Sequence, residues 1–385
     1  MKLALVTETY PPEINGVAMT LSQLVAGLRE KGHQVQVVRP LQTSETCEPT
    51  SKPDSITVSG LPIPRYPDLR FGLPSRNRLI HSWQKSRPDI VHVATEGPLG
   101  LSAIRAAKRM GIPSTSTFHT NFHSYSEHYN AKFATRLVLA FLRWIHNQTE
   151  STMAPTQELA DQLAAEGFRN TAVFGRGVNL KVFNPQARDQ GLRRSWGADP
   201  ETPVIIHVSR LAAEKNYSLL LKSYKAILHA CPNAKFVIVG GGPMESALKR
   251  DFPFAIFPGA IPLENRPALA RLYASSDIFL YPSKTETYGN VATEAMACGN
   301  ALVGFDYAAP GQHIKQGITG FKADLDDDES FVEHGLKLAT NTQLRREIGL
   351  AASGYSEAFD WQPIVDRFES ILFQVKAENE MALLP

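Results

Sequence analysis

Residues 277–306 read DIFLYPSKTETYGNVATEAMACGNALVGFD. The segment opens with a short apolar run, continues through a polar loop, and passes a helix-length stretch before a second apolar run. An order of strand, loop, helix and strand is typical of a βαβ unit, whose two strands lie parallel in one sheet. The segment therefore predicts a buried parallel sheet in this part of the chain.

The same alternation extends through the second half of the chain. Its strand-like runs are residues 203–209, 234–240, 254–259, 277–283 and 300–306. Helix-length segments between them begin near Asn216, Pro243, Asn265 and Asn290. Repeated βαβ units predict a doubly wound domain with a parallel sheet.

A second set of alternating elements fills the first half. The strand-like runs there are residues 2–8, 34–40, 89–95, 113–119 and 151–155. One helix face between the first two runs consists of Val17, Leu21, Leu24, Val25 and Leu28. Their helical spacing predicts an amphipathic helix on a parallel sheet. The whole chain is therefore of the α/β class, with two doubly wound domains.

The length of 385 residues suits two domains rather than one, because single cores stop growing at about 250 to 300 residues. Residues 176–200 lack sustained periodicity and carry turn residues, so we expect the linker there. The first domain is predicted over 1–180 and the second over 187–362. A last helix, at about 363–385, can pack back on the first domain.

Composition excludes several classes of protein. A hydrophobic content of 43% and a charged content of 20% are those of a globular chain. Residues 1–180 hold 19 Lys and Arg against 14 Asp and Glu, while the remainder holds 21 against 24. This asymmetry fits an anionic ligand or membrane surface near the first domain, or random surface variation. It is too weak to indicate nucleic-acid binding.

Cysteine usage and hydropathy bear on the cellular compartment. The three cysteines, Cys47, Cys231 and Cys298, are widely spaced, which favours a reducing compartment over a disulfide framework. No run approaches the length of a membrane span, and the N-terminus meets Glu8 before a signal-peptide core can form. We expect a cytoplasmic protein, with peripheral contact to the inner face of the cell membrane open.

Glu286 and Glu294 stand eight positions apart in the segment that decides the fold. A loop carboxylate after a strand can accept hydrogen bonds from sugar hydroxyls, and one inside the helix can take both hydroxyls of a ribose. The N–H groups at the helix start suit a diphosphate. Two Glu at this spacing are also common on plain helix faces. The preceding strand favours the binding interpretation, because ligands of parallel sheets bind at the carboxyl ends of strands.

Arg210 and Lys215 follow another strand end, in HVSRLAAEKN at 207–216. Two cations there can stabilise a diphosphate leaving group as its charge grows, or they can be solvated surface residues. The turn VGGGPM at 239–244 lacks the full dinucleotide-binding spacing. We interpret it as a tight strand-to-helix turn that can also approach a nucleotide.

Together these residues resemble the retaining family-four glycosyltransferases of GT-B fold, in which two Rossmann-like domains face each other across a cleft. The motifs of the resemblance are TETYPPEINGV at 7–17, GRGVN at 175–179, HVSRLAAEKN at 207–216 and ETYGNVATEAMACG at 286–299. Within that family the chain is similar to phosphatidylinositol mannosyltransferases and sulfoquinovosyl diacylglycerol synthases. The shared segments are VSGLPIPRYPDLRFGLP at 58–74 and TFHTNFHSYSEHY at 117–129.

The resemblance implies a role for each matching residue. Glu286 would contact donor-sugar hydroxyls, Glu294 the ribose, and Arg210 with Lys215 the diphosphate. The loop after Glu286 would supply backbone donors to the donor; its residues are Thr287, Tyr288, Gly289, Asn290 and Val291.

Two residues of the first domain also match the family. Gly16 would allow close approach of the backbone to donor phosphate or acceptor, although it can also serve only the helix entry. His119 would hydrogen-bond the donor sugar. A zinc cluster of His119 with its neighbours His123 and His128 is not favoured, because only Glu127 joins them at convincing ligand spacing.

The resemblance further implies transfer of a hexose with retention of configuration, without a protein nucleophile. The expected donor is GDP-mannose, with a UDP-sugar as the alternative, and the expected acceptor is a lipid or glycan hydroxyl. No cofactor is expected, and no metal, since Arg210 and Lys215 would neutralise the diphosphate. Residues 132–146, KFATRLVLAFLRWIH, predict an apolar helix that can touch a membrane, although a buried core helix is favoured.

Other functions on the same fold remain open. A nucleotide-sugar epimerase fits the domain pattern, as does a phosphorylase, which would need a pyridoxal-binding lysine that no motif identifies. A catalytically silent sugar-nucleotide-binding scaffold is a rival from another class. The presence of Gly16, His119, Arg210, Lys215, Glu286 and Glu294 together argues for the enzyme.

Overall fold

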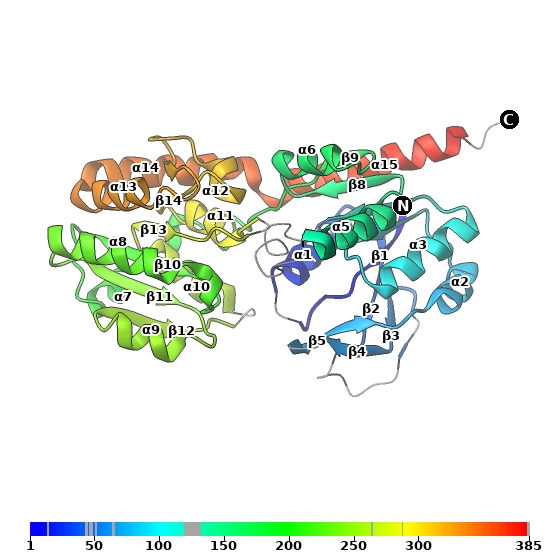
Figure 1. Ribbon diagram of the computed structural model, residues 1–385, viewed down its shortest axis with the longest axis horizontal. Helices are drawn as coiled ribbons and strands as arrows, with labels where there is room; N and C mark the ends of the chain where they lie inside the picture. Colours follow the sequence, from blue (N-terminus) through cyan, green and yellow to red (C-terminus); the bar gives the residue numbers. More distant parts are fainter. Residues whose placement is uncertain are drawn as a thin grey trace. The chain divides into compact units, whose positions relative to one another are not determined.

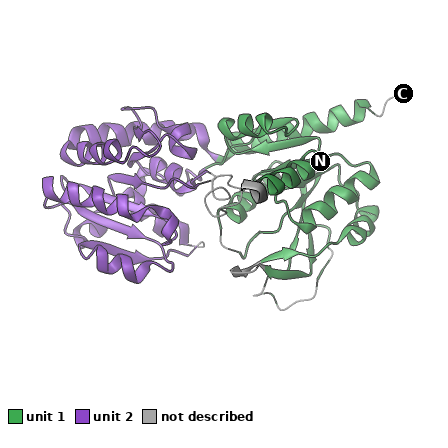
Figure 2. Ribbon diagram, in the orientation of Figure 1, with its two compact units in different colours: residues 1–177, 361–385 green, residues 178–360 purple. Residues whose placement is uncertain are grey.

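The computed structural model describes residues 1–13, 15–42, 45, 49–50, 52–63, 66–118, 132–262, 265–286 and 288–382. The chain divides into two compact units (Figure 2). Unit 1 comprises residues 1–177 and 361–385, and unit 2 comprises residues 178–360. Each unit is built on its own parallel sheet (Figure 1).

The sheet of unit 1 has the strand order β3-β2-β1-β6-β7-β8-β9. Its strands are β1 (Lys2–Val6), β2 (Gln34–Pro40), β3 (Ser55–Val58), β6 (Ile90–Val93), β7 (Ser114–Thr117), β8 (Ser151–Ala154) and β9 (Thr171–Val173). An antiparallel hairpin adds β4 (Gly60–Ile63) and β5 (Tyr66–Gly72). The central strand β1 pairs parallel with β2 and β6, which places Leu3 opposite both Val35 and Ile90.

Helices cover both faces of this sheet. They are α1 (Gly16–Glu30), α2 (Arg76–Lys85), α3 (Pro98–Met110), α5 (Lys132–His146), α6 (Gln157–Ala165) and α15 (Trp361–Ala382). Because side chains alternate along a strand, Leu3 and Leu5 pack with α1 and α15, while Ala4 and Val6 pack with α2 and α3. The expected helix face of α1 is buried, with Val17 at its margin.

Helix α15 lies directly against α1. A Cβ on Gly27 would lie 2.6 Å from Cγ2 of Val365, so only glycine allows this approach. Lys31 extends the contact by pairing with Asp366 and Glu369. The last helix of the chain is therefore part of the core of unit 1.

The sheet of unit 2 has the strand order β12-β11-β10-β13-β14-β15. Its strands are β10 (Val204–Val208), β11 (Lys235–Val239), β12 (Ala255–Gly259), β13 (Ile278–Tyr281), β14 (Ala301–Phe305) and β15 (Gly320–Ala323). Its helices are α7 (Gln190–Ser195), α8 (Tyr217–Ala230), α9 (Glu245–Asp251), α10 (Arg266–Ala274), α11 (Asn290–Ala297), α12 (Ala308–His313), α13 (Asp328–Thr340) and α14 (Thr342–Tyr355). Short 3-10 turns cover Pro185–Ala187, Ala213–Lys215 and Ser356–Phe359.

Helices cover both faces of this second sheet as well. Ile206 and Phe279 pack on the side of α10 and α11, whereas Ile205 and Leu280 pack on the side of α8 and α13. The predicted fold class of two Rossmann-like sheets is confirmed, and each strand-like run named above contains a strand. Burying each such Ile, Leu or Phe contributes about 1.5 to 3 kcal/mol.

Two expectations differ from the structure. The boundary between the units lies at 177–178, inside the expected linker 176–200, but most of that segment belongs to unit 2, where Phe183 and Arg193 are buried. Helix α5 is not a fully buried core helix. Its Leu142 and Ile145 are buried, but Leu137, Phe141 and Trp144 are 57%, 52% and 47% exposed. In the part of the chain that is described, no helix is long and apolar enough to cross a membrane.

Candidate functional site

The strand order of unit 2 reverses between β10 and β13. The chain builds β11 and β12 outward from β10, then returns to add β13, β14 and β15 on the other side. Strands β10 and β13 are hydrogen-bonded neighbours, with Ile206 opposite Phe279. Ligands of open parallel sheets bind at the carboxyl ends of strands at such a reversal. Lys215 follows β10 and Glu286 follows β13, so both lie at this place.

Lys215 and Glu286 form a direct ion pair. The Lys215 ammonium donates to Oε1 of Glu286, and the Ser283 hydroxyl donates to the same oxygen at 3.0 Å. Both side chains are largely buried, at 14% and 19% exposure. When a ligand binds, the carboxylate can accept from a sugar hydroxyl and the ammonium can donate to a phosphate oxygen, in place of their contact with each other.

Arg210 lies on the same loop but faces solvent. It is 57% exposed and pairs with Glu214 four residues on, at 2.5 Å. An exposed pair of this kind contributes roughly 0 to 1 kcal/mol. Replacing Glu214 by a ligand phosphate would therefore cost little.

A buried polar network fixes the start of this loop. His207 Nδ1 lies 2.9 Å from the carbonyl oxygen of Leu280, and its Nε2 lies 2.9 Å from the Ser209 hydroxyl. Burial lowers the pKa of His207 to about 4, so the ring is neutral at pH 7. A proton on Nδ1 then donates to Leu280, and Nε2 accepts from Ser209. The ends of β10 and β13 are thereby joined.

The glycine turn at 240–242 supports the same loop. A Cβ on Gly240 would lie 1.9 Å from the carbonyl oxygen of Ser209, and one on Gly242 would lie 2.4 Å from that of Leu211. Both glycines have a positive φ, +141° and +154°. The turn therefore packs its backbone against the residues on either side of Arg210.

Glu294 lies inside α11 and is 7% exposed. The Arg266 guanidinium donates to its Oε1, and the Tyr273 hydroxyl lies 3.5 Å from its Oε2. Burial raises the pKa of Glu294, and Arg266 opposes this rise. Arg266 also stands over the Phe183 ring, 4.7 Å from the centroid. Sequence reasoning missed Arg266, because an arginine at the start of a helix belongs to no motif.

The segment between the two glutamates forms the start of α11. Gly289, with φ +92°, stands at the N-cap position of the helix and has no side chain to accept from the first helical N–H groups. The first helical residues Asn290 and Val291 are partly exposed. N–H groups at a helix start suit an anion. The Tyr288 hydroxyl lies 2.8 Å from His313 Nε2, and Thr287 is outside the described residues.

The two predicted residues of unit 1 have different outcomes. Gly16 is the exposed first residue of α1. Asn15 caps that helix by accepting from the N–H groups of Val17 and Ala18 at 3.0 and 2.9 Å. The cap occupies the N–H groups of Val17 and Ala18, and the N–H group of Gly16 is not part of it. His119 is outside the described residues, as are His123 and His128.

Glu8 is a residue of unit 1 that sequence reasoning did not select. It follows β1, and the strand order of this sheet reverses between β1 and its neighbour β6. Its carboxyl accepts from the N–H groups of Gly72 and Leu99. Burial raises its pKa to about 7, although these hydrogen bonds lower it. A carboxyl that titrates near neutrality therefore lies at the switch point of the first sheet.

The described residues of unit 2 thus bring together Lys215 and Glu286, with Arg210, Glu294 and the α11 start on the surrounding segments. These groups suit sugar hydroxyls and phosphates. Among the described residues, no three His, Cys, Asp or Glu side chains are grouped to hold a metal ion.

Comparison with known proteins agrees with this chemistry. Residues 14–182 match the family model "Glycosyltransferase Family 4", and residues 189–354 match "Glycosyl transferases group 1". A GDP-mannose-dependent alpha-mannosyltransferase of Mycolicibacterium smegmatis is 33% identical over 97% of this chain and 98% of its own length. The sulfoquinovosyl transferase SQD2 of Arabidopsis thaliana is 28% identical over 94% of this chain and 71% of its own.

Solved structures share the fold at low identity. Sucrose-phosphate synthase of Thermosynechococcus elongatus superposes with a TM-score of 0.75 at 16% identity, covering 98% of this chain and 99% of that one. Anabaena HepE in complex with UDP gives 0.75 at 17% identity, covering 97% and 100%. Family models and relatives together show that the chain belongs to the glycosyltransferases with Family 4 and group 1 domains, and that it is a glycosyltransferase of GT-B fold.

Proposed function

We propose that the protein is a retaining hexosyltransferase that moves mannose from GDP-mannose to a hydroxyl of a lipid or glycolipid, forming an α-glycosidic bond. The Lys215–Glu286 pair at the strand reversal of unit 2 is the observation that carries this proposal. The donor follows from relatives, since the 33% identical protein is named a GDP-mannose-dependent alpha-mannosyltransferase.

The proposed mechanism gives each group of unit 2 one task. Glu286 accepts hydrogen bonds from the hydroxyls of the donor sugar, and Glu294 accepts from the ribose. Lys215 and Arg210 stabilise the charge that accumulates on the diphosphate as the glycosidic bond breaks. The acceptor attacks from the side of the leaving phosphate, whose oxygen takes the proton. His119 and Gly16 keep their proposed roles toward donor sugar and phosphate.

We also propose that turnover needs no divalent metal. The support is the pair of cations on the loop after β10, which can take the place of Mg²⁺ at the diphosphate. Turnover that survives EDTA treatment is expected. A loss that Mg²⁺ or Mn²⁺ restores would contradict metal independence.

The experiment for the function measures nucleoside diphosphate release from GDP-mannose, UDP-glucose and ADP-glucose with lipid acceptors. Thermal unfolding of the same protein with each donor reports binding separately, since a ligand at 100 times its Kd stabilises by about 2.7 kcal/mol. GDP-mannose is expected to stabilise and to react, and Glu286→Ala is expected to lower release about 100- to 1000-fold. If a nucleotide sugar shifts the transition but no acceptor gives release, the scaffold interpretation replaces the enzyme.

A UDP-sugar-dependent glycolipid synthase is the alternative. Its support is the 28% identity to SQD2 and to an alpha-monoglucosyldiacylglycerol synthase of Acholeplasma laidlawii. Release of UDP from a UDP-sugar, without release of GDP from GDP-mannose, would favour this alternative.

We propose that α5 touches an anionic membrane from the cytoplasmic side. Leu137, Phe141 and Trp144 form an exposed apolar stripe, and Arg136 lies beside it. Apolar side chains next to cations favour binding at an anionic bilayer surface. Sedimentation with phosphatidylglycerol vesicles is expected to weaken in Phe141→Ser, but not in the control Leu350→Ser, which alters an apolar side chain of α14 that is 77% exposed. Equal sedimentation of both variants would contradict this contact.

A further inference from the structure

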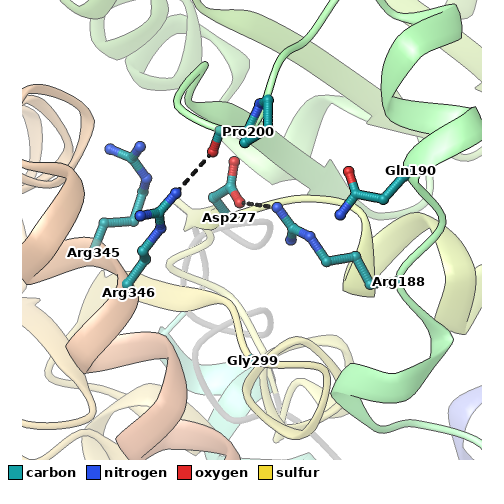
Figure 3. A pocket seen from close by; sticks show the side chains of 7 residues that line it. All are labelled: Arg188, Gln190, Pro200, Asp277, Gly299, Arg345 and Arg346. Carbon is teal, nitrogen blue, oxygen red and sulfur yellow. Dashed lines mark hydrogen bonds and ion pairs between the residues drawn. The ribbon is translucent and has the colours of Figure 1, made fainter.

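A cavity of about 280 Å³ lies in unit 2, and Figure 3 shows the side chains that line it. Pro200 precedes β10, Asp277 directly precedes β13 and Gly299 precedes β14. These residues place the cavity at the amino ends of the strands. Lys215 and Glu286 follow the carboxyl ends, so the two sites are at opposite edges of one sheet.

Three arginines line the cavity: Arg188, Arg345 and Arg346. Arg345 and Arg346 belong to α14, and Arg188 follows the 3-10 turn Pro185–Ala187 (Figure 3). Guanidinium groups that converge from different elements on one concave surface are typical of sites for planar or tetrahedral oxyanions.

The carboxylate of Asp277 does not balance these charges. Its Oδ1 accepts from Arg188 at 2.9 Å and its Oδ2 accepts from Arg193 at 2.9 Å. The backbone N–H of Val204 donates to Oδ2 as well, also at 2.9 Å. One negative charge is therefore shared between two guanidinium groups, and Arg193 is only 1% exposed.

Of the two arginines of α14, only Arg346 forms an ion pair with a described residue. Arg345 is 3% exposed and donates to the carbonyl oxygens of Leu338 and Ala339, which carry no formal charge. Arg346 pairs with Glu201 at 2.7 Å. Asp199 also interacts electrostatically with Arg193, so four guanidinium groups in and beside the cavity meet three carboxylates, which leaves an excess of one positive charge.

Unused donors remain on the accessible arginines. Arg346 bonds through Nη2 alone, to Glu201 and to the Pro200 carbonyl oxygen, and it is 59% exposed. Arg188 uses Nη1 and one hydrogen of Nη2. Among the described residues, no partner takes the Nε–H of either side chain or the Nη1 hydrogens of Arg346. A ligand oxygen can accept from them.

We propose that this cavity binds a small phosphorylated anion. Its phosphoryl oxygens would accept from Arg188 and Arg346, while buried Arg345 adds positive potential from behind. The site is separate from the donor site and would let the protein respond to a second ligand. Free inorganic phosphate and the phosphate of a phosphomonoester share this chemistry.

The test measures binding of inorganic phosphate and of glycerol 3-phosphate by calorimetry, at an ionic strength held constant with KCl. It uses the full chain carrying Lys215→Ala, so that a phosphate in the donor site contributes little. Saturable binding with a Kd of about 1 mM or tighter is expected. A tighter Kd for glycerol 3-phosphate assigns the site to a phosphomonoester, and a tighter Kd for phosphate assigns it to the free ion.

Arg346→Gln is the decisive variant, because its exposed side chain contributes little to folding. Its Kd is expected to be at least 10-fold weaker than that of the parent, and the Kd of Arg346→Lys should lie between the two. Arg250→Gln is the matched control, since Arg250 is 75% exposed on α9, and its Kd should equal that of the parent. Equal binding in Arg346→Gln and the parent would overturn the proposal. So would the absence of saturable binding. None of these results bears on donor turnover.

Discussion

Lys215 and Glu286 are 71 residues apart in the chain, yet their side chains form an ion pair at the ends of two neighbouring strands. The pair is formed by topology, because β10 and β13 meet where the strand order reverses. Each charge neutralises the other until a donor supplies new partners. Lys215 and Glu286 should therefore act as a unit in catalysis.

Lys215→Ala is expected to lower kcat for nucleoside diphosphate release about 100- to 1000-fold, the usual loss for one preorganised charge at a leaving group. Glu286→Ala should lose a comparable amount. The double variant should be little worse than either single one, because residues that act together are not additive. Lys249→Ala, which removes an exposed lysine of α9, is the control and should keep full turnover. Additive losses would mean that the pair has no joint function.

Arg266→Gln should weaken donor binding more than it slows the chemical step. Arg266 opposes the burial that raises the pKa of Glu294, so removing it raises that pKa further. The Glu294 carboxyl would then be protonated to higher pH, and the affinity of the variant for the donor should increase as the pH rises. Donor titrations at a series of pH values report this change. Arg271→Gln, on the same helix, should give the parent profile.

Gly240→Ala should displace the loop that carries Arg210, since the added Cβ would lie 1.9 Å from the Ser209 carbonyl oxygen. Gly259→Ala is the matched control. Gly259 also has a positive φ, +84°, but no atom lies within 4 Å of its added Cβ. Both variants pay the backbone strain of about 1 kcal/mol, and only Gly240→Ala should lower turnover by more than about 10-fold. Equal turnover of the two variants would contradict the support given by the glycine turn.

Glu8 should make the stability of unit 1 depend on pH. Its pKa is raised from 4.5 to about 7 in the folded state, so the folded chain binds more protons between these values. The free energy of unfolding therefore loses up to about 3 kcal/mol from this group as the pH rises from 4.5 through 7. Glu8→Gln removes that loss. Urea unfolding at a series of pH values, followed by tryptophan fluorescence, measures the difference between the two proteins.

The control for Glu8 is Glu158→Gln, which changes an exposed carboxyl of α6 in the same unit. Its difference from the parent should stay constant across the series. A Glu8→Gln difference that is equally constant would show that the buried carboxyl does not titrate in this range.

The fold was largely predictable because its strands are continuous apolar runs. Residues 204–208 and 301–305 are buried throughout, so periodicity and length identify them. The hairpin β4–β5 was missed because GLPI and YPDLRFG contain proline and charges, and only tertiary pairing makes them strands. The burial of helix α5 was overestimated because the helix is rich in apolar residues. Its apolar residues are too many for the buried side, and the excess, including Phe141, is exposed.

The site residues that belong to sequence motifs were predictable. Glu286 and Lys215 were selected from strand ends, and the structure joins them. Arg266 and Glu8 were not, since their significance comes from burial and from partners far away in sequence. Gly72 and Leu99, which donate to Glu8, lie 64 and 91 residues from it. No local pattern carries that information.

Helix α15 has a consequence for how the protein is made. The core of unit 1 includes Val365, Phe368 and Leu372, which the ribosome adds only after all of unit 2. Unit 2 is continuous from residue 178 to 360 and can fold while synthesis continues. Until α15 emerges, the part of unit 1 that is synthesised first exposes the apolar surface that α15 later covers. The sheet that is synthesised first is thus completed last, and chaperone protection during translation should be needed mainly by unit 1.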